Sequence, residues 1–148
     1  GSGGFLVIYG GKLTTHRALA EDVLANLETL GLSMSGSWTK NVPLYGGKLD
    51  RAALEAKAEA GPDSVPAATR HRWAFTYGDR IEDLFARLKA DRASAKDVAP
   101  GVLEAELEYA AEAEDAMTAD DFLLRRTKLH LLLDEPGRNA VREWFAGT

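Results

Sequence analysis

The sequence predicts an all-α protein, a compact bundle of about six or seven helices with one apolar strand at its N-terminal end. Apolar residues recur at spacings of three and four along most of the chain, and capping residues or Gly and Pro breaks separate these stretches. Only Phe5–Tyr9 is continuously apolar and rich in branched and aromatic side chains, which is typical of a strand buried on both faces. No second strand is predicted, because the stretch 38–45 is short and contains Pro43.

Composition limits the class of protein. At 148 residues the chain is long enough for one domain with a real core. It has no cysteine, which excludes disulfides, thiolate zinc sites and cysteine nucleophiles and is compatible with a cytosolic setting. A net charge of −5 argues against nucleic-acid binding, and no apolar run approaches the roughly 18 to 20 residues that span a bilayer. Residues 1–4, GSGG, resemble an expression remnant and are left out of the fold prediction.

The first two helices follow from their caps. Thr14 or Thr15 is expected to cap a helix that continues to about Leu30 and stops at the glycine that follows. Asp50 is expected to cap a second, alanine-rich helix that ends near Ala60.

Two further helices are predicted, one before and one after Gly78. Pro66 opens a helix that carries Trp73 and ends at Gly78. Asp79 is then expected to cap a fourth helix, with the sequence DRIEDLFARLKA. A looser segment, residues 91–101, follows it.

The last part of the chain contains three more predicted helices. The first covers residues 102–115 and buries a stripe formed by Leu103, Leu107, Ala110 and Ala111. Thr118 and Asp121 resemble a capping box that starts a helix through ADDFLLRRTKLHLLL. Pro136 suits the first turn of the final helix, which is expected to extend through Trp144.

The turn after the predicted strand is the candidate binding site. Gly10 and Gly11 let backbone N–H groups at a helix start approach an anion or a carbonyl oxygen without interference from a side chain. Lys12 adds a mobile positive charge, and Thr14 and Thr15 could cap the helix or donate to a ligand. On the residues alone, a plain strand-to-helix turn remains the alternative.

Two nucleotide motifs are excluded at this turn. A phosphate-binding loop needs a glycine five positions before the second glycine and Ser or Thr directly after the lysine, where the chain has Leu6 and Leu13. The G-x-G-x-x-G fingerprint of dinucleotide sites is also absent around this turn. A second copy of YGGKL at residues 45–49 follows Pro43 and is expected to be a turn that leads into the helix capped by Asp50.

Four stretches, taken in order, resemble the C-terminal part of the aerobic FAD-dependent glycerol-3-phosphate dehydrogenases. They are YGGKLTTHRALAE, SWTKNVPLYGG, RHRWAFTYGDR and LEAELEYAAEAEDAMTADDFLLRRTKLHL. Together they cover nearly the whole chain, from about Phe5 to Trp144. No single stretch would be specific, but four in the same order are typical of this family.

The resemblance implies two parts. Residues 1–15 would be a tag remnant followed by the last strand and turn of an FAD domain, and residues 16–148 would be the C-terminal helical cap domain. It also implies contacts to the flavin from the turn residues Gly10, Gly11, Lys12, Leu13 and Thr14. Lys12 would in addition reach the substrate, whereas the catalytic base would lie outside this chain.

The resemblance further implies the activity of the full-length protein. That protein would oxidise sn-glycerol 3-phosphate to dihydroxyacetone phosphate and pass electrons to quinone, in the cytoplasm or peripherally on the inner membrane face. The partner of this chain would be the FAD and substrate domain of the same protein, and capping, gating and homodimer formation all remain open as its role. His16 replaces the usual tyrosine, so a hydroxyl contact is not expected there. A related polyol phosphate such as erythritol phosphate is an alternative substrate.

The remaining charged and aromatic residues favour structural roles. Arg125, Arg126 and Lys128 are expected to form ion pairs with the acidic run of residues 104–115. The three histidines lack the spacing of a metal site, and the three tryptophans are expected to be core or interface anchors. A stand-alone helical interaction module without catalytic role is the alternative function. Under the main hypothesis the chain alone should neither bind FAD nor turn over substrate.

Overall fold

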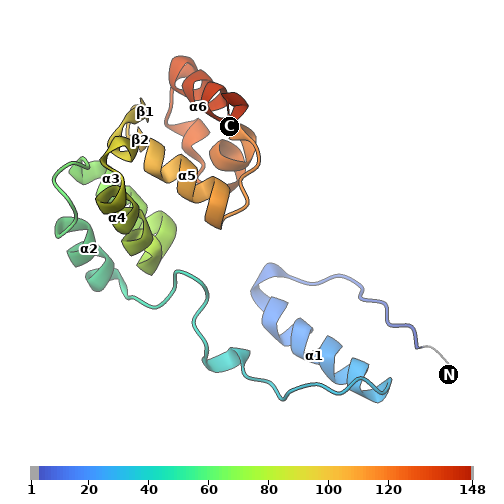
Figure 1. Ribbon diagram of the computed structural model, residues 1–148. Helices are drawn as coiled ribbons and strands as arrows, with labels where there is room; N and C mark the ends of the chain where they lie inside the picture. The colour runs from blue at the N-terminus through green and yellow to red at the C-terminus, as the bar shows by residue number, and fades with distance from the viewer. Residues whose placement is uncertain (1–3, 148) are drawn as a thin grey trace. The chain divides into compact units, whose positions relative to one another are not determined.

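The computed structural model describes residues 4–147, and these contain six α-helices, six shorter helical turns and two short strands (Figure 1). The helices are α1 (His16–Thr29), α2 (Arg51–Glu59), α3 (Ala67–Tyr77), α4 (Ile81–Ala90), α5 (Glu104–Ala113) and α6 (Glu135–Gly147). The strands are β1 (Asp97–Ala99) and β2 (Val102–Leu103). The predicted helical class is therefore confirmed, with a small sheet added. The chain divides into two units, Gly1–Leu44 and Tyr45–Thr148, which are described separately.

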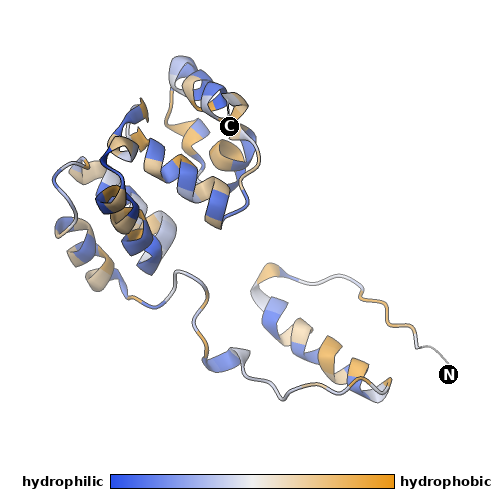
Figure 2. Cartoon of the chain, viewed as in Figure 1, coloured by the Kyte–Doolittle hydropathy of each residue, from blue (hydrophilic) through white to orange (hydrophobic). Residues whose placement is uncertain are grey.

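The first unit contains an extended segment, a turn and one long helix. Phe5–Tyr9 is not assigned as a strand, so the predicted strand is not confirmed. These residues are exposed, with Phe5 and Tyr9 at 91% and 89% of their full surface. The apolar segment and the apolar residues of α1 are visible as orange ribbon in Figure 2. Within the described part of this unit, residues 4–44, no side chain is fully buried.

Helix α1 ends as predicted. Gly31 has a φ of +90°, and the N–H groups of Leu30 and Gly31 donate to the carbonyls of Leu27 and Glu28 at 3.0 Å. Leu32 N–H adds a bond to the Leu27 carbonyl at 3.3 Å. A glycine at this left-handed position satisfies the last carbonyls of a helix without steric cost.

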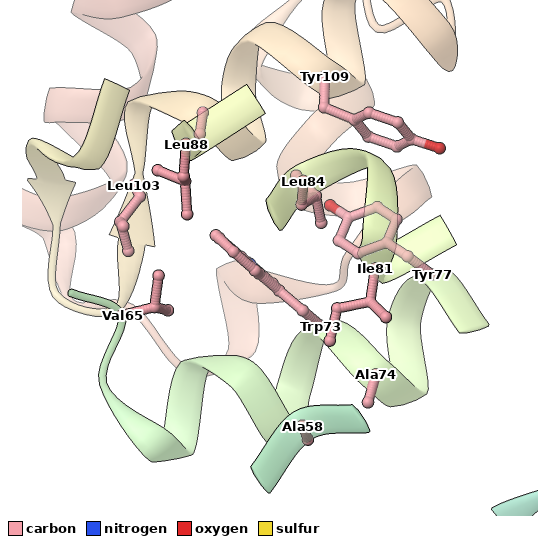
Figure 3. Packing of buried hydrophobic residues seen from close by; sticks show 11 residues of the cluster. Ala58, Val65, Trp73, Ala74, Tyr77, Ile81, Leu84, Leu88, Leu103 and Tyr109 are labelled. Atoms are coloured by element: carbon pink, nitrogen blue, oxygen red, sulfur yellow. The ribbon is translucent and has the colours of Figure 1, made fainter. Parts of the chain in front are cut away.

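The second unit begins with α2 and α3. Asp50 caps α2 as predicted, since its carboxylate accepts from Ala53 N–H at 2.9 Å. Pro66 directly precedes α3, and Trp73 on that helix is fully buried. Figure 3 shows the Trp73 indole in the middle of the first core cluster, among side chains of α3, α4 and the strand region. The buried members of this cluster are Ala58, Val65, Trp73, Ala74, Tyr77, Ile81, Leu84, Leu88, Leu103, Ala105 and Tyr109.

The junction between α3 and α4 differs from the prediction. Gly78 has a φ of +59° and opens the 3-10 turn η3 (Gly78–Arg80). No side chain caps α4, so the predicted cap by Asp79 is wrong. The Asp79 carboxylate instead accepts from the Lys48 backbone N–H at 3.4 Å. The backbone N–H of Asp79 donates to the Gly46 carbonyl at 3.1 Å. The second YGGKL copy is therefore a turn that packs on this junction, as expected for a structural element.

The segment predicted as loose contains the 3-10 turn η4 (Arg92–Ala95) and the strand β1. β1 pairs with β2 in an antiparallel sense, with Asp97 opposite Leu103 and Ala99 opposite Val102. The connecting residues are Pro100 and Gly101, and Gly101 has a φ of +72°. Proline followed by a glycine at positive φ is the signature of a tight turn.

The last third of the chain forms a second core. Its buried residues are Ala99, Val102, Leu107, Ala110, Ala116, Ala119, Phe122, Leu123, Leu129, Leu133 and Val141. The predicted capping box is confirmed: Thr118 Oγ1 accepts from Asp121 N–H at 3.2 Å, and the Asp121 carboxylate accepts from Thr118 N–H at 3.0 Å. The helix that follows is shorter than predicted, because it is the π-helical turn η5 (Asp121–Arg126), separated from the 3-10 turn η6 (Leu129–Leu131). Asp134 caps α6 by accepting from Gly137 N–H at 2.9 Å.

Candidate functional site

The predicted binding turn lies between the extended N-terminal segment and α1. Gly10 and Gly11 have φ values of +72° and +134°, which an L side chain rarely adopts. A Cβ at Gly10 would contact nothing, whereas one at Gly11 would lie 2.9 Å from the Leu19 side chain. The glycine pair is thus required by backbone conformation rather than by crowding within the described residues.

The residues after the glycines form the 3-10 turn η1 (Leu13–Thr15), which continues into α1. Thr15 does not cap the helix through its side chain. Its hydroxyl donates to the Lys12 carbonyl at 3.1 Å, and its N–H donates to the same oxygen at 3.0 Å. His16 Nδ1 lies 2.7 Å from the Leu13 carbonyl. The predicted cap by Thr14 or Thr15 is therefore absent, and the start of η1 and α1 has no side-chain acceptor.

Within residues 4–147, the first backbone donors of this turn are therefore not capped by any side chain. The N–H groups at a helix start carry the positive end of the helix dipole and stabilise an anion or a developing negative charge. Lys12 is exposed and, among residues 4–147, its ammonium makes no ion pair or side-chain hydrogen bond. Leu13 is 88% exposed and supplies an apolar contact surface beside these donors. The turn therefore suits a planar, partly anionic ligand.

No metal-ligand group accompanies this turn in the part of the chain that the structure describes. Within residues 4–147 no cluster of three or more His, Cys, Asp or Glu side chains could hold a metal ion. His130 Nδ1 lies 2.9 Å from the Leu123 carbonyl oxygen, which accepts a hydrogen bond when Nδ1 is protonated, so this histidine has a structural contact. In the same part of the chain, no helix combines the length and the apolar composition needed to cross a bilayer.

A buried ionic cluster in the second unit was not predicted. The Glu106 carboxylate on α5 has no exposed surface, and both of its oxygens accept from the Arg72 guanidinium on α3 at 2.6 Å. The Tyr77 hydroxyl donates to the same carboxylate at 2.8 Å, and Arg72 also donates to the Gly101 carbonyl at 2.7 Å. Burial, and then the Glu106 charge, raise the pKa of Tyr77 well above its usual value, so the phenol stays protonated.

The signal for this cluster was present in the sequence. Glu106 follows Leu103 by three positions and precedes Ala110 by four, so it belongs to the apolar stripe of its helix. A charged residue at a core position requires a buried partner. Arg72 and Tyr77 lie in the third stretch of the family resemblance and Glu106 in the fourth, which gives these motifs a structural explanation.

The surface ion pairs also differ from the prediction. Two acidic residues of α5 pair with Arg87 of α4, whose guanidinium lies 3.4 Å from Glu108 and 2.5 Å from Glu112. Arg125 pairs with Asp121 one turn before it, at 2.6 Å. Arg126 is exposed. The predicted pairing of Arg125 and Lys128 with the acidic run is replaced by these contacts, because α4 lies beside α5.

The three tryptophans lie in different environments. Trp73 is a core residue, and Trp144 is partly buried, with its indole N–H donating to Glu104 at 3.0 Å. Trp38 is 61% exposed and is not a core residue of the described chain.

Taken together, the structure defines a helical domain preceded by an apolar segment and a glycine turn that leads into a helix. A sequence model of a known family, the C-terminal domain of alpha-glycerophosphate oxidase, matches residues 37–146. This match covers most of the chain, and the chain therefore belongs to that family of C-terminal domains.

Three relatives are similar over most of the chain, and two of them over nearly all of it. The chain is 36% identical to D-erythritol 1-phosphate dehydrogenase of Brucella abortus, over 98% of this chain and 30% of that protein. It is 34% identical to glycerol-3-phosphate dehydrogenase of Pseudomonas aeruginosa, over 86% of this chain and 25% of that protein. It is 32% identical to the aerobic glycerol-3-phosphate dehydrogenase of Escherichia coli, over 98% of this chain and 29% of that protein. The chain thus spans less than a third of the length of each of these relatives.

Proposed function

We propose that this chain is the C-terminal part of an FAD-dependent dehydrogenase of a polyol phosphate. The main candidate reaction is oxidation of sn-glycerol 3-phosphate to dihydroxyacetone phosphate, with electrons passed on to quinone. The observation that carries this proposal is the family match over residues 37–146, combined with alignment of nearly the whole chain to dehydrogenases of phosphorylated polyols.

The glycine turn is the proposed contact to the flavin. Gly10 and Gly11 keep the backbone accessible, and the helix start that follows has no side-chain acceptor. Lys12, Leu13 and Thr14 complete the turn, and their residue types suit a planar ligand with anionic character. Bound FAD would supply the hydride acceptor for the C2 position of the substrate. The residues of this chain would orient that cofactor and stabilise negative charge beside it through N–H donors.

Lys12 has a second proposed role. Its side chain is long, charged and without a partner in residues 4–147, so it can reach an oxygen or a phosphate of the substrate. It would bind and orient the substrate rather than transfer a proton.

The helical unit from Tyr45 onward has a proposed structural role in this protein. Its conspicuous ionic cluster, Arg72, Tyr77 and Glu106, is used for internal contacts. We therefore expect the chain alone to be inactive and to bind FAD weakly or not at all. The proposed partner is the remainder of the same protein. We expect the complete protein to lie in the cytoplasm or peripherally on the inner face of the membrane.

A second candidate substrate is D-erythritol 1-phosphate. The relative that is a D-erythritol 1-phosphate dehydrogenase is 36% identical, compared with 34% and 32% for two glycerol-3-phosphate dehydrogenases. The difference is small, and the substrate pocket of the full-length protein would decide between the two polyols.

The test is to express the complete gene that encodes this chain and to purify the protein. We expect a flavin spectrum with one FAD per protein and reduction of that flavin by glycerol 3-phosphate under anaerobic conditions. D-erythritol 1-phosphate is assayed in parallel, and a higher kcat/KM for it would select the second candidate.

A variant of the same protein tests whether the glycine turn is needed for FAD binding. Gly11→Val forces a branched side chain onto a φ of +134° and should remove FAD while the helical unit stays folded. Lys96→Gln, an exposed charge in the helical unit, should leave the flavin spectrum unchanged. A gene that encodes only this chain, or a complete protein without flavin, would favour a stand-alone interaction module instead.

A further inference from the structure

A groove with a volume of about 940 Å³ lies in the helical unit between the end of α2, helix α4 and the turn η4. Its apolar lining residues include Phe85, Leu88, Ala56, Ala60 and Ala95. Cavities of roughly 300 to 1,000 Å³ with a mainly apolar lining are typical of small-molecule sites. All residues that line the groove belong to the unit Tyr45–Thr148, and the glycine turn belongs to the unit Gly1–Leu44.

The rim of this groove is cationic although the chain as a whole is acidic. Lys57, Lys89 and Arg92 line it, together with a single carboxylate, Glu82. Lys57 is paired with Glu82 across the groove, between α2 and α4. Among residues 4–147, Lys89 and Arg92 make no ion pair or side-chain hydrogen bond, and both are exposed. Two positive charges therefore remain for a ligand.

Apolar lining and unpaired positive charge select the chemistry of the occupant. A purely apolar ligand would leave both cations without a partner, and a small inorganic anion would leave the aromatic lining in water. We propose that this groove binds a free amphipathic anion with a single apolar chain and a carboxylate head, such as a medium-chain acyl carboxylate. Its chain would pack against Phe85 and the alanines, and its head would contact Lys89 and Arg92.

The geometry offers a direct reporter of binding. The Trp73 indole is fully buried, and its centroid lies 6.5 Å from that of Phe85, which lines the groove. A ligand that contacts Phe85 should therefore shift the NMR signal of the Trp73 indole N–H. It should also shift the backbone amides of Phe85, Lys89 and Arg92.

The experiment titrates the chain with sodium decanoate, below the concentration at which it forms micelles, and follows these signals and the heat of binding. We expect saturable binding that weakens with added salt, because the charge contacts are exposed. Decanol and inorganic phosphate are the two matched probes. Each supplies only one half of the proposed ligand and should bind weakly or not at all.

Two pairs of variants separate the charge from the apolar lining. The double change Lys89→Gln and Arg92→Gln should weaken decanoate binding about tenfold, as expected for the loss of two exposed charge contacts. Its control, Lys48→Gln with Lys96→Gln, removes the same net charge at two residues that do not line the groove. Ala56→Leu should narrow the groove and also weaken binding, whereas Ala52→Leu on the same helix does not line it and should have no effect.

Several results would overturn the proposal. The absence of saturable shifts with decanoate, or equal affinity for decanol and decanoate, would do so. Binding of anionic phospholipid vesicles without a response to decanoate would identify a membrane surface as the occupant instead. An equal loss of affinity in both double-charge variants would show that only the net charge matters.

Discussion

At the scale of single residues, Glu106 shows how this domain keeps a carboxylate in its core. A buried charge is tolerated only where hydrogen bonds replace its hydration. Arg72 supplies two such bonds at 2.6 Å and Tyr77 a third at 2.8 Å, so every acceptor oxygen has a donor. The three residues come from α3 and α5, and the cluster fixes how these helices pack.

Glu106→Gln is expected to destabilise the chain by about 3 kcal/mol, because it leaves the Arg72 charge partly buried without its counter-ion. The measurement is the free energy of unfolding from denaturant titration. Glu112→Gln is the control, since that carboxylate is 65% exposed and also pairs with an arginine, and its loss should cost less than about 1 kcal/mol. Equal effects of the two substitutions would contradict a special role for the buried cluster.

Glu114 allows a prediction about pH. Partial burial is the main cause and raises its pKa; the positive charge of Arg126 lowers the pKa by a smaller amount, and the negative charge of Glu106 raises it by the smallest amount. A carboxyl whose pKa is raised on folding binds protons more tightly in the folded state, so its ionisation lowers stability as the pH rises through that pKa. Glu114→Gln should therefore stabilise the chain slightly at pH 7. The gain should disappear below the usual carboxyl pKa of 4.5. Urea titrations at pH 7 and at a pH below that value measure it. A gain that persists at low pH would exclude this electrostatic explanation.

At the scale of elements, the junction of α3 and α4 depends on two glycines in contact. A Cβ at Gly78 would lie 1.7 Å from the Gly46 carbonyl oxygen, which is far inside any permitted contact. The same carbonyl accepts the Asp79 N–H at 3.1 Å. The turn at residues 45–49 is thereby fixed against the start of η3.

Gly78→Ala should be among the most destabilising single substitutions in the helical unit. It combines the cost of positive φ, about 1–2 kcal/mol, with displacement of the Gly46 backbone, about 1–3 kcal/mol more. Gly101→Ala is the matched control, because its φ is +72° but its Cβ would lie an ordinary 3.5 Å from Thr69 Oγ1. Thermal unfolding of both variants measures the loss of stability, and the difference between them gives the cost of the steric clash at Gly78. A similar loss of stability in both would show that only the backbone conformation matters.

The elements that could be predicted are those whose signals are local. Asp50, the box of Thr118 with Asp121, and Gly31 act on backbone groups within a few residues, and all three were predicted correctly. The hairpin of β1 and β2 was missed because strands of three and two residues are too short to show alternation. Its Pro100–Gly101 turn was the available signal. Asp79 was assigned wrongly because its actual contact, Lys48, is far away in sequence.

The candidate site could be predicted only in part for a similar reason. The positive φ at Gly10 and Gly11 follows from the residue type, and the turn into α1 was expected. The absence of a threonine cap could not be predicted, because the Thr15 hydroxyl can donate to the Lys12 carbonyl as easily as it can accept from a helix N–H. The roles of Lys12, Leu13 and Thr14 toward a cofactor stay a prediction.

At the scale of the whole molecule, stability is concentrated in one of the two units. The two buried clusters and the side chains packed on them all come from residue 54 onward. Residues 4–44, by contrast, contain no buried side chain and expose large apolar groups such as Phe5, Leu13 and Trp38. Exposed apolar surface of this extent is typical of an interaction surface, which agrees with the proposal that an FAD domain covers this segment in the complete protein.

Removal of residues 1–44 should therefore leave the helical unit folded. The chain that starts at Tyr45 loses no member of either cluster and keeps the contact of Gly46 with Gly78. Its free energy of unfolding is expected to agree with that of the 148-residue chain to within about 0.5 kcal/mol. Amide exchange on the longer chain provides the second measurement: amides of α3, α4 and α5 should exchange only through global unfolding, and those of residues 5–30 much faster. In the complete protein the slow class should extend to residues 5–30, because the flavin domain would then cover them. Protection of these residues in the 148-residue chain alone would show that they need no further partner, and would remove the main physical reason for assigning them to a larger fold.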